Sequence, residues 1–122
     1  MKRIILLAFL CTTTLVMAQR INHVQEAIAN YDYEAALTLI AKEKPTIPLL
    51  LQKGKAQRGL GMNTEELSNY KEIITNDTAN TRAYIEAAEC CRSLAKYQQA
   101  LKYYEQALDL NPENKYVRIQ YI

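Results

Sequence analysis

An internal repeat is the feature that most constrains what this sequence can fold into. When residues 47–80 are aligned with residues 81–114, small residues meet small ones and aromatic residues meet aromatic ones. The matching pairs are Gly54 with Ala88, Leu60 with Leu94, Tyr70 with Tyr104, Ile74 with Leu108 and Asp77 with Asn111. A weaker and slightly shorter copy occupies residues 17–46. A period of about 34 residues indicates stacked copies of one structural unit that bury a shared core.

Each copy has the periodicity of two amphipathic helices. In the third copy, apolar residues recur at the spacing of one helix face from Tyr84 to Cys91, and again from Ala100 to Leu108. Only 3 Gly and 3 Pro are present, too few for a fold of many short strands. The sequence therefore predicts helices at residues 20–30, 33–43, 47–60, 64–76, 79–94 and 97–110, with a final helix from about residue 113.

Capping signals agree with several of these boundaries. Pro48 is suited to open a helix, and Gly61 is suited to end it. Asn63, with Glu66 three residues later, resembles a capping pair. Asn111 is expected to cap the last helix, with Pro112 in its first turn.

A helix–turn–helix unit of this length resembles the tetratricopeptide repeat. Residues 81–114 carry the resemblance best, and the residues that fill its signature places are Tyr84, Ala88, Tyr97, Ala100, Tyr104, Ala107 and Pro112. The resemblance implies an all-α, right-handed helix-turn-helix solenoid. Its three repeats would occupy residues 17–46, 47–80 and 81–114, and residues 115–122 would form a partial C-terminal capping helix.

Two residues depart from the repeat pattern. Val24 stands where the first copy should have a small residue, and Glu66 stands at the close-approach position that Ala100 fills in the third copy. A carboxylate in that position must bend to the surface or find a partner. We therefore expect looser packing, or a shifted second helix, in the second copy.

The N-terminus has the pattern of a secretory signal. Lys2 and Arg3 precede an apolar core, and Val16-Met17-Ala18 is a cleavage sequence that predicts a cut after Ala18. Residues 1–18 would then be the signal peptide and residues 19–122 the mature repeat domain. The alternatives are an uncleaved anchor, a buried first helix, or lipid attachment at Cys11. The apolar stretch spans about 22 Å as a helix, short of the roughly 30 Å hydrocarbon core, so we expect no stable membrane span.

Removal of the signal changes the charge balance. The full chain has a formal net charge of +2, and loss of Lys2 and Arg3 leaves 13 basic residues against 13 acidic ones. No basic excess remains to neutralise phosphates, so the sequence argues against nucleic-acid binding.

The mature chain offers little for catalysis. His23 is the only histidine, and a packing or surface role suits it better than a catalytic one. Cys90 and Cys91 are adjacent, which suits two small apolar packing residues better than a disulfide; a vicinal redox or soft-metal pair is the alternative. Phosphate loops, HExxH and CxxC motifs are all missing. We expect no enzyme activity, no cofactor and no metal site.

The resemblance implies a binding surface on the concave side, formed by the first helix of each repeat. The inward-facing residues would be Ile21, Gln25 and Ile28 in the first copy, Leu51, Lys55 and Arg58 in the second, and Ile85, Glu89 and Arg92 in the third. Lys55, Arg58 and Arg92 would form a modest cationic stripe, partly cancelled by Glu89, that could clamp a carboxylate. A solvated face without a partner is the alternative.

These features together predict an exported, non-catalytic scaffold that binds a protein or peptide segment, located in the periplasm or secreted. A first alternative is a subunit or fragment that docks end-on into a cell-envelope assembly through its apolar C-terminal helix. We also expect residues 113–120 to dock as a partial cap, with Tyr116 and Ile119 on the helix at 97–110, and the protein to self-associate through this end. A redox protein that uses Cys90 and Cys91 is a second alternative. Replacing Arg58 with glutamate is expected to abolish groove binding.

Overall fold

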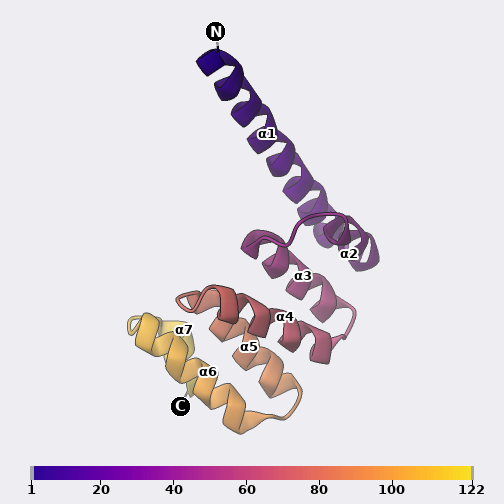
Figure 1. The fold of residues 1–122 in the computed structure, drawn as a ribbon. Coiled ribbons are helices and arrows are strands. Elements are labelled where there is room, and N and C mark those ends of the chain that lie inside the picture. Colours follow the sequence, from indigo (N-terminus) through magenta and orange to yellow (C-terminus); the bar gives the residue numbers. More distant parts are fainter. Residues whose placement is uncertain (1, 122) are drawn as a thin grey trace.

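Helical hairpins stacked side by side make up the protein. The computed structural model describes residues 2–121, with side chains described for residues 11–120. The helices are α1 (Lys2–Ala29), α2 (Tyr33–Ala41), α3 (Ile47–Gly59), α4 (Asn63–Asn76), α5 (Thr81–Ser93), α6 (Tyr97–Leu110) and α7 (Lys115–Tyr121). Helices α1 and α2, α3 and α4, and α5 and α6 pair as hairpins (Figure 1). The fold is therefore the predicted all-α helix-turn-helix solenoid.

The predicted boundaries between residues 33 and 110 agree with these helices to within two residues. The first helix differs, because it begins at Lys2 rather than at residue 20 and runs without interruption to Ala29. Its N-terminal half projects away from the stacked hairpins (Figure 1). Among the described residues, no helix combines the length and apolar character needed to cross a membrane.

The turn inside each hairpin has the same backbone geometry. Tyr31, Gly61 and Ala95 have φ angles of 61°, 71° and 57°, which lie in the left-handed region. The amide of the next residue donates in each case to a carbonyl of the helix that has just ended: Asp32 to Ala27, Met62 to Gln57 and Lys96 to Cys91. This is the Schellman arrangement, in which glycine is the preferred residue at the left-handed position. Gly61 ends its helix as predicted.

Glycine at the third turn should therefore stabilise the protein. An alanine in the left-handed region costs roughly 1 kcal/mol, so Ala95→Gly should raise the free energy of unfolding by about that amount. Gly61→Ala is the reciprocal change at the same turn position, and a Cβ there would meet no atom within 4 Å. Urea unfolding should show an increase in the free energy of unfolding for Ala95→Gly and a decrease for Gly61→Ala. Changes of the same sign in both variants would contradict this account.

Three of the longer connections end in side-chain caps at equivalent positions of the repeat. Thr46, Asn80 and Asn114 accept hydrogen bonds from the amides of Leu49, Ala83 and Val117, at 3.4, 3.0 and 3.2 Å. Pro48 follows the first of these caps, as predicted. The capping role predicted for Asn111 is wrong, because Asn114 caps α7 and Pro112 precedes that helix.

The predicted capping pair of Asn63 and Glu66 is also wrong. Met62 is the N-cap of α4, and no side chain caps this helix. Glu66 is instead 1% exposed and forms an ion pair with Arg58 of α3. The sequence allows two outcomes for this carboxylate, and the structure shows the second, in which it finds a partner.

The core consists of two clusters of buried side chains. The larger cluster joins α3, α4, α5, α6 and α7, and Tyr70 and Tyr104 are its largest fully buried side chains. The smaller cluster joins α1, α2 and α3 and includes Val24, which is buried although the pattern expects a small residue. The ring of Tyr70 on α4 packs directly against the backbone of α3 at Gly54, because a Cβ on this glycine would overlap the ring. The first hairpin therefore shares its core with α3 of the second hairpin.

The shortening of the first repeat falls at the end of its second helix. Helix α2 has 9 residues, whereas its counterparts α4 and α6 have 14 each. The connection from Lys42 to Thr46 replaces the last turns of this helix. The missing turns leave a hollow between α2 and α3.

Helix α7 docks with a different face from the predicted one. Val117 is fully buried in the larger cluster. Tyr116 and Ile119, which the sequence pattern places against α6, are 48% and 70% exposed. The prediction fails because Val117, one full repeat after Ala83, is the counterpart of that buried residue. Helix α7 therefore stands where the first helix of a further repeat would stand.

Candidate partner-binding groove

The first helices of the successive hairpins form one row, which is the candidate concave face predicted from the sequence. Helix α1 contacts α3. Arg58 of α3 donates to Glu86 of α5 at 2.7 Å, and Arg92 of α5 donates to Gln120 of α7 at 2.6 Å. Donor and acceptor are 28 residues apart in both pairs, so the same bridge is used twice. The row of helices α1, α3, α5 and α7 is thus continuous.

An apolar row crosses this face. The residues at equivalent positions in the four helices are Ile21, Leu51, Ile85 and Ile119. The first three are half-buried and pack against the two core clusters, whereas Ile119 is largely exposed. Leu51 and Ile85 are among the binding residues predicted from the sequence, but Ile119 is not. Its place one repeat after Ile85 is the signal that could have identified it.

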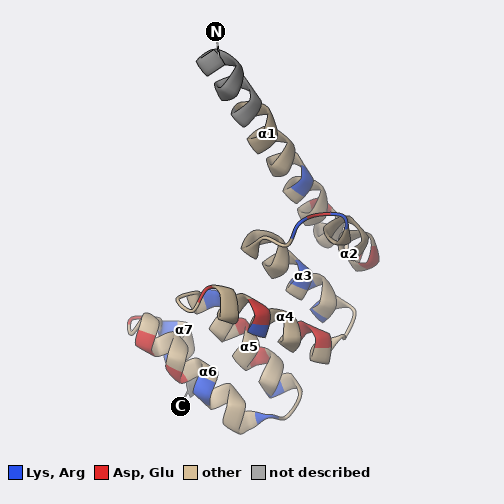
Figure 2. Ribbon diagram, viewed as in Figure 1, with Lys and Arg blue, Asp and Glu red and all other residues tan. Residues whose placement is uncertain are grey.

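Arg58 is the centre of a charge network within the protein. Its guanidinium lies 2.7 Å from carboxylate oxygens of both Glu66 and Glu86, and 3.9 Å from Glu89. Arg82 adds a longer contact of 3.9 Å to Glu86. Helix α3 carries basic residues only, whereas α4 and α5 carry both acidic and basic residues (Figure 2). The guanidinium is already occupied by the protein's own carboxylates, which argues against the predicted carboxylate clamp at this residue.

The pKa values reflect this crowding. Burial by itself lowers the pKa of Arg58, but Glu86 and Glu66 outweigh it and raise the pKa above the ordinary value. Burial, and then Glu86, raise the pKa of Glu89, although Arg58 and Arg92 oppose them. Glu89 also accepts a hydrogen bond from the hydroxyl of Tyr116 on α7. Glu89 and Arg58 are therefore part of the packing between helices.

The remaining predicted groove residues differ in accessibility. Gln25 is exposed on α1, and Lys55 is partly exposed on α3. Arg92 is exposed, and its guanidinium is hydrogen-bonded to Gln120. A hollow of about 390 Å³ lies beside Glu89, Arg92, Ser93 and Tyr97. The polar side of the groove thus carries Gln25, Lys55 and Arg92, next to the apolar row.

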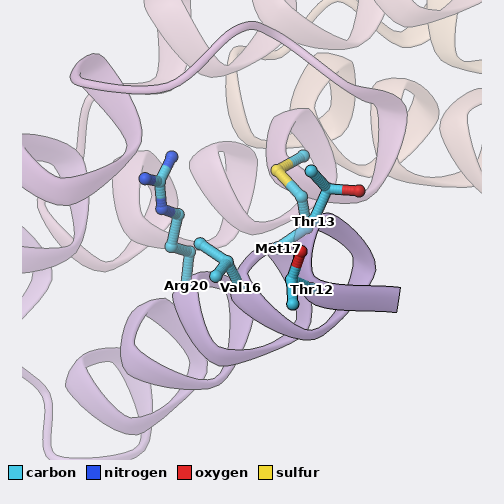
Figure 3. A pocket seen from close by; sticks show the side chains of 5 residues that line it. All are labelled: Thr12, Thr13, Val16, Met17 and Arg20. Carbon is cyan, nitrogen blue, oxygen red and sulfur yellow. The ribbon is translucent and has the colours of Figure 1, made fainter. Parts of the chain in front are cut away.

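A second hollow, of about 280 Å³, lies along α1 (Figure 3). The side chains that line it are Thr12, Thr13, Val16, Met17 and Arg20. Arg20 forms an ion pair of 2.7 Å with Glu43 in the connection between α2 and α3. The helix is therefore tied to the repeats two residues after the predicted cleavage position at Ala18.

Both cysteines of the repeats are packing residues. Cys90 and Cys91 are free and almost fully buried. The thiol of Cys90 donates to the carbonyl of Asn63 at 3.2 Å. Burial raises the pKa of Cys90 to about 12 and also raises that of Cys91. A nucleophilic thiol needs a lowered pKa and an accessible sulfur, so the environment opposes the redox alternative. The described residues also contain no cluster of side chains that could hold a metal ion.

These pKa values predict a loss of stability at alkaline pH. The unfolded chain releases the thiol protons near pH 8.5, whereas the folded protein keeps the Cys90 proton until about pH 12. The unfolded state therefore binds fewer protons in this interval, and the free energy of unfolding falls as the pH rises. Thermal unfolding from pH 8 to pH 11 should show a falling midpoint, with a smaller slope for Cys90→Ala. An equal slope in both proteins would contradict the assignment.

The comparisons with known proteins agree with this geometry. Residues 81–114 match the family model of the tetratricopeptide repeat. The structure of PcrH in complex with the chaperone-binding region of PopB superimposes with a TM-score of 0.76 at 17% identity, over 87% of this chain and 91% of that chain. A further match describes PcrH as coming from Pseudomonas aeruginosa. No curated protein matches the sequence significantly.

Two other similar solved structures are both first tetratricopeptide-repeat domains of RPAP3 proteins. The first tetratricopeptide-repeat domain of human RPAP3 has a TM-score of 0.76 at 19% identity, covering 84% of both chains. The first such domain of Spaghetti (RPAP3), bound to the HSP90 peptide SRMEEVD, has a TM-score of 0.76 at 19% identity, over 85% and 86% of the chains. Residues 81–114 are thus a tetratricopeptide repeat by sequence, and the chain as a whole has the fold of tetratricopeptide-repeat domains.

Proposed function

We propose that the protein is a non-catalytic adaptor that binds a segment of a protein partner on its concave face. The observation that carries the proposal is the apolar row Ile21, Leu51, Ile85 and Ile119, with Gln25, Lys55 and Arg92 beside it. Apolar contact with a few polar groups at its edge is typical of peptide-binding surfaces. PcrH with a region of PopB and Spaghetti with an HSP90 peptide support the same use of this fold.

The charge network around Arg58 limits which chemical groups of a partner could bind here. Arg58 is occupied by Glu66, Glu86 and Glu89, so a partner carboxylate would have to displace an existing ion pair. Lys55 and Arg92 are the cations left at the edge of the apolar row. The partner segment would therefore bind mainly through apolar side chains, with a minor contribution from its acidic groups.

Export remains part of the proposal. The basic residues at the start, the apolar core and the Val16-Met17-Ala18 sequence support a signal peptide cleaved after Ala18 and a periplasmic or secreted protein. The mass of the protein recovered from the cell envelope or the medium tests this directly. A mature chain that begins at Gln19 supports export, and recovery of the chain with residues 1–18 still attached would contradict it.

Groove binding can be tested with peptides selected from a random library against the protein. Peptides that use the apolar row should bind about tenfold more weakly to Ile119→Lys, since burial of one isoleucine contributes about 1.5 kcal/mol or more. Lys55→Glu should also weaken the binding of peptides that carry acidic residues. Leu101→Lys on α6 is the matched control, because Leu101 is exposed but lies outside the groove. Selected peptides that bind all variants equally would refute the groove as the binding site.

End-on docking is a second candidate, which one observation favours. Leu67 is buried between repeats, whereas its counterpart in the next repeat, Leu101, is 41% exposed. The same Leu101→Lys variant separates the two functions. Sedimentation over a hundredfold concentration range would detect self-association through the C-terminal end. If Leu101→Lys abolishes this self-association and leaves peptide binding unchanged, docking through the C-terminal end is favoured.

A further inference from the structure

A hollow of about 330 Å³ lies where the shortened first repeat meets the second. Its lining comes from α2, the connection that follows it, α3 and the turn before α4: Leu37, Ile40, Ala41, Glu43, Pro45, Leu50, Lys53, Gln57 and Met62. Ala41 and Pro45 are exposed, so the hollow opens at the surface beside this connection. Its volume falls at the lower end of the range for sites that bind small molecules.

The next junction of the solenoid shows what is missing here. Ile40 and Leu50 of the hollow correspond, one repeat further along the chain, to Tyr70 and Tyr84. Both tyrosines belong to the larger cluster: the hydroxyl of Tyr84 donates to the carbonyl of Thr78 in the connection before α5, whereas the ring of Tyr70 lies against Gly54 of α3. The first junction thus has two aliphatic side chains in place of two phenol rings, and it also lacks the last turns of the second helix. The hollow beside Leu50 and Pro45 therefore corresponds to the position of Tyr84 at the next junction.

A polar group lies just behind the mainly apolar lining of this hollow. Gln57 is 5% exposed, and its Oε1 has no hydrogen-bond partner among the described residues. The counterpart of Gln57 in the third repeat is Cys91, which is also buried. A buried amide oxygen without a partner is unfavourable, because it has lost its hydrogen bonds to water. A ligand that brings a hydrogen-bond donor would remove this cost.

We propose that the hollow receives the side chain of a tyrosine from a partner protein. The ring would lie beside Leu50, at the place that corresponds to Tyr84 at the next junction, and the hydroxyl would donate to Oε1 of Gln57 once this amide, which is closed to water in the structure, turns toward the hollow. Leu50, Lys53 and Gln57 lie on a different face of α3 from Leu51 and Lys55, because about 3.6 residues complete a turn. The site is therefore separate from the groove, and its test does not depend on groove binding.

The test uses 4-methylphenol, the side chain of tyrosine, and toluene, which has the same shape without the hydroxyl. Titrations of the full chain followed by amide chemical shifts should show 4-methylphenol saturating at residues that line the hollow. Affinities in the millimolar range are expected for so small a ligand. Toluene should bind about tenfold more weakly, because it leaves Gln57 unpaired. Absence of saturable binding, or equal binding of both probes, would overturn the proposal.

Two variants sharpen the result. Gln57→Leu should remove the preference for the phenol without destabilising the fold, and a preference that survives would exclude the role of Gln57. Leu50→Tyr repeats the residue found at the next junction, and it should fill the hollow and abolish binding of both probes. If wild-type protein instead self-associates and Leu50→Tyr abolishes that association, the occupant is a tyrosine of a second copy, and the proposal of a different partner is wrong.

Discussion

Arg58→Met should lower the free energy of unfolding by roughly 3 kcal/mol. The variant leaves the carboxylate of Glu66, which is 1% exposed, without its counter-charge at 2.7 Å. An unpaired buried charge is costly because water cannot solvate it. Since the side chain of Arg58 is itself 41% exposed, the expected loss lies at the lower end of values for buried ion pairs. Urea unfolding of the full chain measures it.

The next repeat supplies the matched control. Arg92 is the counterpart of Arg58, but its partner Gln120 is neutral, and Ala100 stands at the position of Glu66. Arg92→Met should therefore cost much less than Arg58→Met, because no buried charge loses its partner. Replacing Arg58 and Glu66 together with methionine should restore most of the stability and give a coupling energy of about 2 kcal/mol. If Arg58→Met and Arg92→Met were equal in effect, the ion pair would have no structural role.

Gly54→Val is expected to destabilise the protein by about 3 kcal/mol or more. A Cβ at residue 54 would overlap the hydroxyl and ring carbons of Tyr70, which is buried in the larger core cluster. A glycine within a helix is otherwise unfavourable by about 1 kcal/mol relative to alanine. Any loss on substitution must therefore come from the packing against Tyr70, and the melting temperature of the variant measures it.

A second substitution identifies the cause. Tyr70→Leu makes room next to residue 54, so Gly54→Val combined with Tyr70→Leu should be more stable than the sum of the two single effects predicts. Gly61→Ala is the control for coupling: it loses stability through its left-handed φ and not through contact with a ring, so its effect should be additive with that of Tyr70→Leu. Additive effects of Gly54→Val and Tyr70→Leu would show that close approach to the ring is not the reason for this glycine.

The repeat period predicts the fold because each unit uses the same local devices. Capping side chains recur at Thr46, Asn80 and Asn114, and left-handed turn residues recur at Tyr31, Gly61 and Ala95. The errors arise where a segment is interpreted without its counterparts in the other repeats. A cap at Asn111 follows from local sequence alone, whereas the repeat period places it at Asn114. The predicted contact of Tyr116 and Ile119 with α6 is a second error of this kind. The repeat period assigns the buried position to Val117, because Val117 lies one repeat after the buried Ala83.

The site is less predictable, because it depends on pairings between helices. The pattern shows that Glu66 needs a partner, but only the antiparallel hairpin places Arg58 opposite it. The predicted cationic stripe therefore includes a charge that the structure uses for internal packing. The hollow beside Gln57 arises from an omission of residues, and a comparison of Ile40 and Leu50 with Tyr70 and Tyr84 could have indicated it.

The repeated bridge from an arginine to a residue of the next repeat also bears on assembly. Arg58 with Glu86, and Arg92 with Gln120, join two unlike surfaces, the leading side of one helix and the trailing side of the next. A contact between unlike surfaces cannot be repeated across a two-fold axis, and it gives a ring if the rotation closes and an open filament if it does not. Copies joined end-on by the same kind of contact would therefore form filaments whose length depends on concentration, or rings, and not a two-fold symmetric dimer.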